Sequence, residues 1–264
     1  MDWNRAKNII IALLFALNLF LLGNYLYTRY TQADSAQTQA ELGTYLASRG
    51  VNLSCTLPQK AQIGRPLMIA ENTDKQAQRA LPLILGEDAH EENGETVSSI
   101  GRLSWVGGML EGSLTPAPEE GDELEAILAR LASAGITTQQ VQRSAAAAVL
   151  IGQYGDPAEP VYNMRLSIEL GEDGAWLLSG RWYLGAPTAA GEDSERDIAG
   201  LLVSFTDRLL TQGAALGEIS AIEQGWVMST LTNVGTQLTP AFRITTDAGI
   251  YFISALDGQA LDLN

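Results

Sequence analysis

Apolar residues dominate the start of the chain. From Ile9 to Leu22 almost every position is Ile, Leu, Phe or Ala. Residues 8–28 together are long enough to cross a hydrocarbon core of about 30 Å as a helix. Two basic residues, Arg5 and Lys7, precede the run against a single one just after it, which favours a cytoplasmic N-terminus. The pattern predicts a cytoplasmic tail (residues 1–7), one transmembrane anchor (residues 8–28) and an extracytoplasmic remainder, on a protein of the cell membrane.

Two alternatives to a retained anchor are open. A cleaved signal peptide needs a small-residue site close behind its apolar segment, and the nearest such site, Ala33–Ser35, lies well beyond Leu22. The other alternative is a buried helix of a soluble domain, but a run this apolar is more typical of a span. Asn18 interrupts the run, and it is either a tolerated polar residue or a hydrogen-bonding contact to a partner span.

A helical period continues directly after the anchor. Within residues 29–50, Leu42, Tyr45 and Leu46 have the spacing i, i+3, i+4, and Gly50 is a suitable residue to end a helix. This pattern predicts a stalk helix that continues from the membrane. We interpret it as a plain spacer between the anchor and the rest of the chain.

Two further helices carry wider apolar stripes. The first follows the acidic run Glu119–Glu123, where the helix dipole favours negative charge, and it ends at Gly135. The second begins near Ser194 and Asp197, which have capping-box spacing. Both stripes are expected to be core: Leu124, Ile127, Leu128 and Leu131 in the first helix, and Ile198, Leu201, Leu202, Phe205 and Leu209 in the second.

Alternation of apolar and polar residues predicts strands elsewhere. It is clearest from Tyr162 to Leu170, followed by a turn at Gly171–Gly174 and a returning strand through Trp176–Leu184, which makes an antiparallel hairpin with one buried face. In residues 51–115 the apolar stretches Leu81–Gly86 and Ser99–Leu114 also predict strands. The closing strands are QGWVMSTL and PAFRITTDAGIYFISALDG.

Strands and helices follow one another without strict βαβ alternation, which indicates an α+β fold with antiparallel sheets covered by helices. The order of a helix followed by strands occurs twice. We therefore expect two α+β domains after the stalk, residues 51–145 and residues 146–264. Their boundary is placed in the alanine-rich stretch RSAAAAV, at residues 143–149.

Composition and charge narrow the function. The formal net charge is −15, from 31 acidic and 16 basic residues, so binding to nucleic acid is not expected. There is one cysteine, Cys55, and one histidine, His90, which excludes an internal disulfide and the common Cys/His zinc sites. His90 lies in the polar stretch GEDAHEENGE and is expected to be a solvated loop residue.

Motifs for catalysis are missing from the sequence. The chain has no nucleophile elbow, P-loop, Rossmann glycine pattern or HExxH motif. A hydrolase that uses paired carboxylates stays open, because such pairing is spatial. We expect no enzymatic activity, no cofactor and no metal. Arg243 is expected to have a structural role, although it could face a partner.

Two stretches carry a family resemblance. The opening MDWNRAKNIIIALLFALNLFLL resembles the start of the YycI proteins: Met-Asp-Trp, a short basic segment, then an Ile/Leu/Phe-rich anchor. GQYGDPAEPVYNMRLSIEL and the closing strands resemble the C-terminal half of that family. Residues 60–118 depart from the family's pattern. The matching positions near the end are Gly225, Trp226, Pro240, Ala241, Phe242, Arg243, Tyr251, Phe252 and Gly258.

The resemblance implies a non-enzymatic accessory protein of Gram-positive bacteria. Proteins of the YycI family sit in the membrane with a sister protein, YycH, and with the sensor histidine kinase WalK, which controls cell-wall metabolism. A YycI-like chain would adjust the kinase through transmembrane and extracytoplasmic contacts. The expected partners are therefore a WalK-like kinase and a YycH-like protein. The alternative from a different class is an extracytoplasmic, PepSY-like binding or inhibitor module for a peptidase or a wall component.

Overall fold

The computed structural model describes residues 13–14, 16–18, 20–21, 37–58, 66–69, 74–115, 122–138, 140–155, 158–185, 187–189, 198–231 and 235–263. After a helix at residues 37–48, the elements are β1 (Asn52–Leu53), β2 (Leu67–Ile69), α2 (Asp74–Leu85), β3 (His90–Glu92), β4 (Glu95–Ser98), β5 (Gly101–Val106), β6 (Met109–Leu114), α3 (Glu123–Ser133), β7 (Gln140–Arg143), β8 (Ala147–Tyr154), β9 (Glu159–Leu170), β10 (Trp176–Arg181), β11 (Thr188–Ala189), α4 (Ile198–Thr211), β12 (Glu218–Leu231), β13 (Gly235–Thr246) and β14 (Gly249–Ser254). The mixed α+β class is confirmed.

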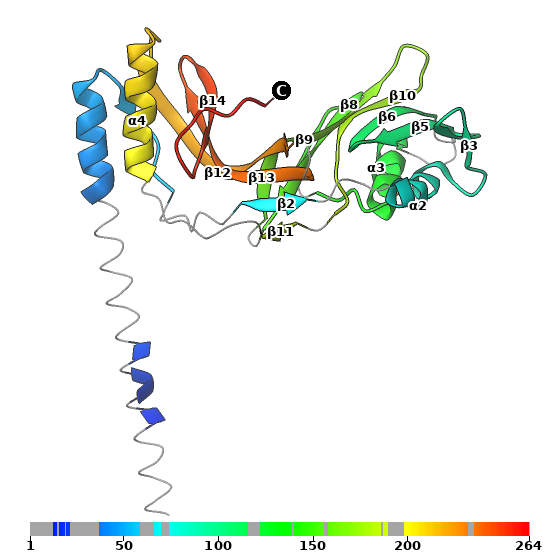
Figure 1. The fold of residues 1–264 in the computed structure, drawn as a ribbon, viewed down its shortest axis with the longest axis horizontal. Coiled ribbons are helices and arrows are strands. Elements are labelled where there is room, and N and C mark those ends of the chain that lie inside the picture. The colour runs from blue at the N-terminus through cyan, green and yellow to red at the C-terminus, as the bar shows by residue number, and fades with distance from the viewer. Residues whose placement is uncertain are drawn as a thin grey trace, which may run out of the picture.

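One bent sheet of strands runs through the molecule, with a pair of helices at each end (Figure 1). At the α3 end, β3–β10 are accompanied by α2 and α3. At the α4 end, β1, β2 and β11–β14 are accompanied by α4 and the helix at residues 37–48. The two ends meet at β9, which pairs antiparallel with β8 and β10 and parallel with β12. Most ladders are antiparallel, as the sequence predicted.

Strands from both sides of residue 145 pair with one another. β6 pairs with β10, β2 with β13, and β1 with β12. The stretch at residues 143–149, predicted as a boundary, forms the turn and adjoining strand ends of the β7–β8 hairpin, where Ala148 is buried. In the described residues the predicted units 51–145 and 146–264 thus share their sheet and do not separate into two sheets. The run of alanines resembled a linker in composition, although it belongs to a hairpin of the sheet.

The hairpin and both stripe-bearing helices follow the predicted pattern. Met164, Leu166 and Ile168 of β9 are buried on one face of the sheet, and the returning strand β10 pairs with β9 from Leu166 to Leu170. Asp122 caps α3, because its carboxylate accepts bonds from the backbone N–H groups of Leu124 and Glu125. The stripe of α4 is buried through Leu201, Leu202 and Phe205, whereas the predicted capping box at Ser194 and Asp197 lies outside the described residues.

Residues 81–86 are a correction to the sequence-based prediction, because they end a helix and do not form a strand. Pro82 lies inside α2, and the helix ends at Gly86, whose φ is +104° and whose N–H donates to the carbonyl of Pro82 (2.8 Å). The buried residues of α2 have the spacing i, i+3, i+4, i+7, i+8 that a helix requires: Ala77, Ala80, Leu81, Ile84 and Leu85. The stretch Leu81–Gly86, which contains the end of this stripe, has no charged or polar side chain and therefore resembled a short buried strand.

Three glycines bring the strands of the α3 end unusually close. Gly101, Gly112 and Gly180 have φ values of +152°, +147° and +157°. A Cβ at any of them would lie 2.1 Å from a carbonyl oxygen of the next strand. Each stands opposite a buried leucine, so the missing side chains belong to the face that covers the core. Glycine alone permits this backbone and this approach.

The apolar core forms one cluster at each end. The α3-end cluster joins α2 and α3 to the sheet and reaches Trp226, Met228 and Leu238 of β12 and β13. The α4-end cluster joins α4 to the helix at residues 37–48, whose Leu42 and Leu46 are 4% and 0% exposed. Of the stalk helix predicted within residues 29–50, residues 37–48 are helical and residues 29–36 lie outside the described residues. Its interpretation as a plain spacer is wrong, because its apolar side is part of a core.

Candidate functional site

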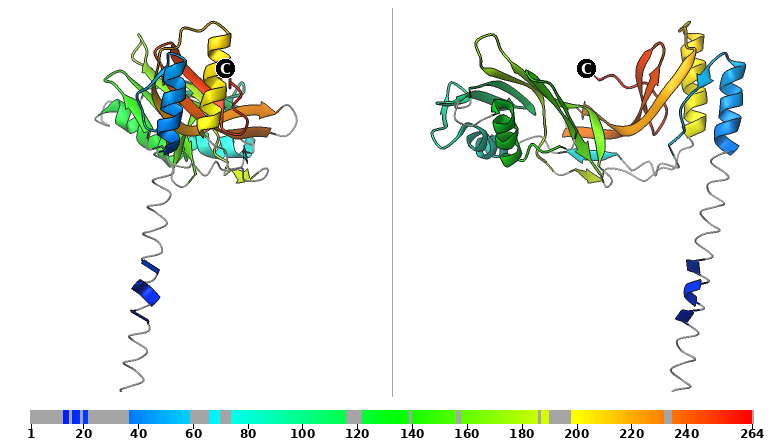
Figure 2. Two further views of the ribbon diagram at one scale, coloured as in Figure 1. Left: turned by 90° about the vertical axis from the view of Figure 1, so that its left-hand side faces the viewer. Right: turned by 180° about the vertical axis from the view of Figure 1, so that it is seen from behind.

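The helix at residues 37–48 and α4 lie side by side at the α4 end (Figures 1 and 2). Around their buried leucines, Tyr45 Oη donates to the Asp207 carboxylate at 2.9 and 3.1 Å. Arg49 Nη2 donates to Tyr45 Oη (3.2 Å) and lies 3.6 Å from Asp207. The ion pair is half exposed and adds little stability by itself. Together with the Tyr45 hydrogen bonds, it links the C-terminal end of this helix to α4.

The chain leaves this helix in a way that holds it from a second side. Gly50 ends the helix with φ +80°, as predicted, and β1 then runs parallel to β12. The N–H of Asn52 donates to Gly217 (2.8 Å), and the N–H of Ser54 donates to Ile219 (3.0 Å). The segment that follows the predicted anchor is therefore attached both to α4 and to the long strand β12.

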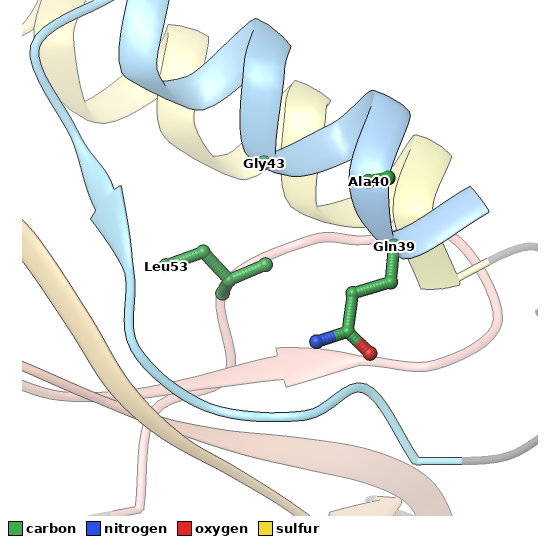
Figure 3. A pocket seen from close by; sticks show the side chains of 4 residues that line it. All are labelled: Gln39, Ala40, Gly43 and Leu53. Carbon is green, nitrogen blue, oxygen red and sulfur yellow. The ribbon is translucent and has the colours of Figure 1, made fainter. Parts of the chain in front are cut away.

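A shallow groove of about 390 Å³ lies between this helix and β1 (Figure 3). Gln39, Ala40 and Gly43 line it from the helix, and Leu53 lines it from β1. Gln39 Nε2 donates to the carbonyl of Cys55 (3.4 Å) across one end. The groove exists because two helix positions that face β1 carry the smallest side chains. No sequence pattern marks this groove, since Ala40 and Gly43 are ordinary residues of a polar helix face.

Replacing Gly43 with alanine tests how empty this groove is. A Cβ at Gly43 meets no atom within 4 Å, and alanine favours a helix more than glycine does. We expect Gly43→Ala to raise the free energy of unfolding by about 0.5–1 kcal/mol, measured by urea unfolding. Gly43→Leu is the matched variant that fills the groove. A loss of stability in Gly43→Ala would contradict an open groove at this place.

Cys55 lies at the end of the groove and is partly buried. Loss of solvent raises the pKa of its thiol above the ordinary value of 9.0. Because the thiolate is the reactive form, Cys55 should react with iodoacetamide at pH 8 about tenfold more slowly than an exposed cysteine. The comparison is a chain carrying Ser48→Cys and Cys55→Ser. The rate should rise as pH approaches the raised pKa, and urea should remove the difference.

A second group of functional candidates lies on the opposite face of the sheet, away from the helices. Arg243 on β13 forms an ion pair with Glu223 on β12, with 3.0 Å between Arg243 Nη1 and Glu223 Oε2. This ion pair agrees with the structural role expected for Arg243. Tyr162 Oη donates to the carbonyl of Glu223 (3.0 Å), and its ring lies 5.0 Å from that of Phe252. Burial raises the pKa of Tyr162.

Gly225 explains part of the glycine-aromatic pattern in β12. A Cβ there would lie 2.8 Å from the Tyr162 ring and 2.5 Å from the carbonyl oxygen of Pro160. The glycine leaves room for the ring of Tyr162 to cross β12. Its neighbour Trp226 points to the other face, into the α3-end core.

The junction of the two ends depends on a side chain that sequence analysis missed. Between β9 and β12 the ladder holds a single pair, Val161 with Trp226. Two residues along β9, Asn163 Nδ2 donates to the carbonyl of Met228 (2.7 Å), and Asn163 Oδ1 accepts from the N–H of Met228 (2.8 Å). The side-chain amide of Asn163 thus makes the two hydrogen bonds to Met228 that the backbone of a neighbouring strand would otherwise make, at the point where β9 and β12 separate.

Glu159 is the half-buried acid near this junction. Loss of solvent raises its pKa, and the side chains of Gln224 and Trp226 oppose this only in part. Trp226 Nε1 is buried and has no acceptor at hydrogen-bonding geometry among the described residues. Tyr154 stands opposite Glu159, and burial raises the pKa of Tyr154 to about 12. Within the described ranges, no three His, Cys, Asp or Glu side chains are placed to hold a metal.

The residues predicted near the membrane are described only in part. Asn18 is helical and exposed, and its Nδ2 donates to the carbonyl of Leu14 one turn earlier (2.9 Å). Its contact to a partner span stays a prediction. Of the helices in the described part of the chain, none combines the length and the apolar content that a bilayer crossing needs. His90 is exposed on the edge strand β3, and its Nδ1 lies 3.1 Å from the carbonyl of Asp88.

Comparison with known proteins gives weak likenesses. No protein-family model and no curated protein matches the chain. A crystal structure of an uncharacterized protein from Eubacterium rectale is 11% identical with a TM-score of 0.42, over 81% of this chain and 91% of that one. The YpeB C-terminal domain of Bacillus megaterium is 9% identical with a TM-score of 0.33, over 73% of this chain and 97% of that one. Likenesses this low assign no family or function, and the resemblance to YycI stays a prediction.

Proposed function

We propose that this chain is a membrane-anchored accessory regulator of a sensor histidine kinase. The observation that carries the proposal is the burial of Leu46 in the helix at residues 37–48, which is separated by eight residues from the end of the predicted anchor. A loose spacer would separate the membrane from the outer domain. A helix built into the α4-end core, joined to the anchor by the rest of the predicted stalk, would instead pass a rotation or shift of the anchor on to α4 and β12.

The regulation we propose is a bias on the kinase's own signalling equilibrium. A span that packs beside the kinase helices in only one of two states shifts their populations by its difference in affinity. A difference of about 1.4 kcal/mol changes the ratio of the two states tenfold. The partners we propose are a WalK-like kinase and a YycH-like protein, with the bulk of this chain outside the cell membrane.

The test separates the anchor from the outer domain. Residues 1–30 are exchanged for an unrelated span of equal length, and both forms are purified from gently solubilised membranes with their bound proteins identified by mass spectrometry. We expect the kinase and the sister protein only with the native span. Equal recovery with both spans would contradict the proposal and would favour the PepSY-like binding module, which needs the outer domain alone.

Rotation of the predicted stalk gives a second readout. Two residues inserted after Ala33 turn a helix by about 200°, whereas seven return it to within about 20° of its original phase. We expect kinase autophosphorylation in proteoliposomes to lose its response to the chain with two inserted residues and to regain it with seven. Equal responses would mean that the span acts as a tether only.

A further inference from the structure

The segment at residues 259–263 lies along the free edge of β14 like an added strand. The turn that leads to it is built by the N–H of Gly258, which donates to Ser254 (2.8 Å), and by Arg208 Nη2, which donates to the carbonyl of Gly258 (3.0 Å). The N–H of Ser254 then donates to Gln259 and the N–H of Leu261 to Phe252, both at 2.8 Å.

Two leucines of this segment enter an apolar surface on the sheet face that lacks helices. Leu261 and Leu263, two residues apart, pack against the outer patch, which we define as Tyr162, Val227, Ala241 and Phe252. Such alternation is how an extended peptide presents side chains to a sheet. Leu261 and Leu263 are only partly buried, although Val227 and Ala241 beneath them are 2% and 0% exposed.

The segment covers only part of the β14 edge. Residues of an antiparallel strand alternate between its two sides, so Ile250 shares the outward edge of Phe252 and Ser254 and the sheet face of Phe252. Its side chain is 51% exposed. Its backbone groups receive no bond from residues 259–263. The opposite edge strand, β3, carries His90, Glu91 and Glu92, all exposed, and charge of this kind discourages strand addition.

Charge distinguishes between the possible occupants of this edge. A second copy of the chain brings a net charge of −15 against −15, which opposes pairing between copies. Glu223 borders the outer patch and is paired with Arg243, so the attraction comes from the net charge of the chain and not from this pair. A peptide with basic residues beside its apolar ones is complementary to that net charge.

We propose that β14 and the outer patch bind an extended segment of a partner protein, with two apolar residues at alternate positions and Lys or Arg beside them. Residues 259–263 occupy this surface in cis and compete with the partner. Entry begins at the open end beside Ile250, and the partner then replaces Leu261 and Leu263. This proposal concerns the outer domain and does not depend on whether a kinase is the partner of the span.

The test uses the full chain in detergent micelles and a labelled peptide, Lys-Ala-Leu-Lys-Leu-Lys, as the probe. Leu261→Ala and Leu263→Ala together release the segment. Because a tethered competitor acts at high effective concentration, we expect the probe to bind this double variant about tenfold more tightly than the wild type. Adding Ile250→Asp should reverse that gain. Leu177→Ala, at a leucine of the α3 end about as exposed as Ile250 (49% and 51%), is the control and should change nothing.

Three results would overturn the proposal. If the double variant keeps the wild-type unfolding midpoint and still fails to bind the probe, this surface is not a binding site. Equal binding of a scrambled peptide with adjacent leucines means general attraction between opposite charges. Dimerisation of the double variant, seen by sedimentation, assigns the edge to a second copy. If the double variant unfolds, Leu263→Ala alone replaces it, with a gain of about threefold expected and the same failures decisive.

Discussion

Gly112→Ala is expected to prevent the chain from folding. The new Cβ would lie 2.1 Å from the carbonyl oxygen of Arg102 and 2.9 Å from the Cα of Leu103, and both are backbone atoms of β5 that cannot turn aside. The φ of +147° is also one that alanine does not adopt without strain. Separating β5 from β6 would open the α3-end core. We expect a loss of more than about 4 kcal/mol, a large part of the stability of an ordinary domain.

The measurement is urea unfolding followed by tryptophan fluorescence, with the yield of folded protein as a second readout. Gly174→Ala is the control, because Gly174 has φ +82° and a Cβ there meets nothing within 4 Å. It should lose only about 1 kcal/mol, the cost of the left-handed backbone. If the Gly112→Ala chain is as stable as the Gly174→Ala chain, then moving β5 away from β6 does not lower the free energy of unfolding, and the prediction is wrong.

Asn163→Asp is expected to loosen the junction between the two ends of the sheet. Aspartate keeps an acceptor for the N–H of Met228 but loses the donor to its carbonyl, and it places a carboxylate oxygen against that carbonyl. We expect a loss of about 2–3 kcal/mol at pH 7, from an unsatisfied carbonyl and a partly desolvated charge. Because β9 and β12 share one other ladder pair, faster amide exchange should appear first in these two strands.

A pH dependence distinguishes this cause from simple loss of packing. We expect the pKa of the new carboxyl group to be raised, because only its protonated form can donate to the carbonyl of Met228. Stability relative to wild type should therefore return as pH falls through that raised pKa, and should be lost again as pH rises. Asn163→Ala lacks both bonds at every pH and is the control. The same pH profile for both variants would exclude the proposed bond.

Local signals predicted the elements that depend on local spacing. The β9–β10 hairpin, α3 and α4 have full apolar stripes or clean alternation, and each is present. α2 was missed because Pro82 and the compact run LPLILG hide a stripe that begins at Ala77. The helix at residues 37–48 was predicted, but its role was not, because the partner that buries Leu46 lies in α4, far along the chain.

The site residues show the same limit. Asn163 and Met228 are 65 positions apart, and neither has an unusual neighbour in sequence. The cover on the β14 edge depends on the turn after Ser254, which brings residues 259–263 back along β14, and no local sequence pattern predicts that contact. Gly225 had a signal, since a glycine beside an aromatic residue in a strand suggests close approach of another group. The ring that approaches it comes from Tyr162, and sequence alone did not supply that partner.

The distance along the chain between the helix at residues 37–48 and its partners also sets an order of assembly. Tyr45 and Asp207 are 162 positions apart, and Ser54 and Ile219 are 165 apart. A ribosome adds roughly 5–20 residues per second, so Leu42 and Leu46 wait on the order of ten to thirty seconds for the surface that buries them. Contacts this remote form late. This helix is thus made among the first and docked among the last, and a chain interrupted before α4 would expose Leu42 and Leu46 to chaperones and proteases.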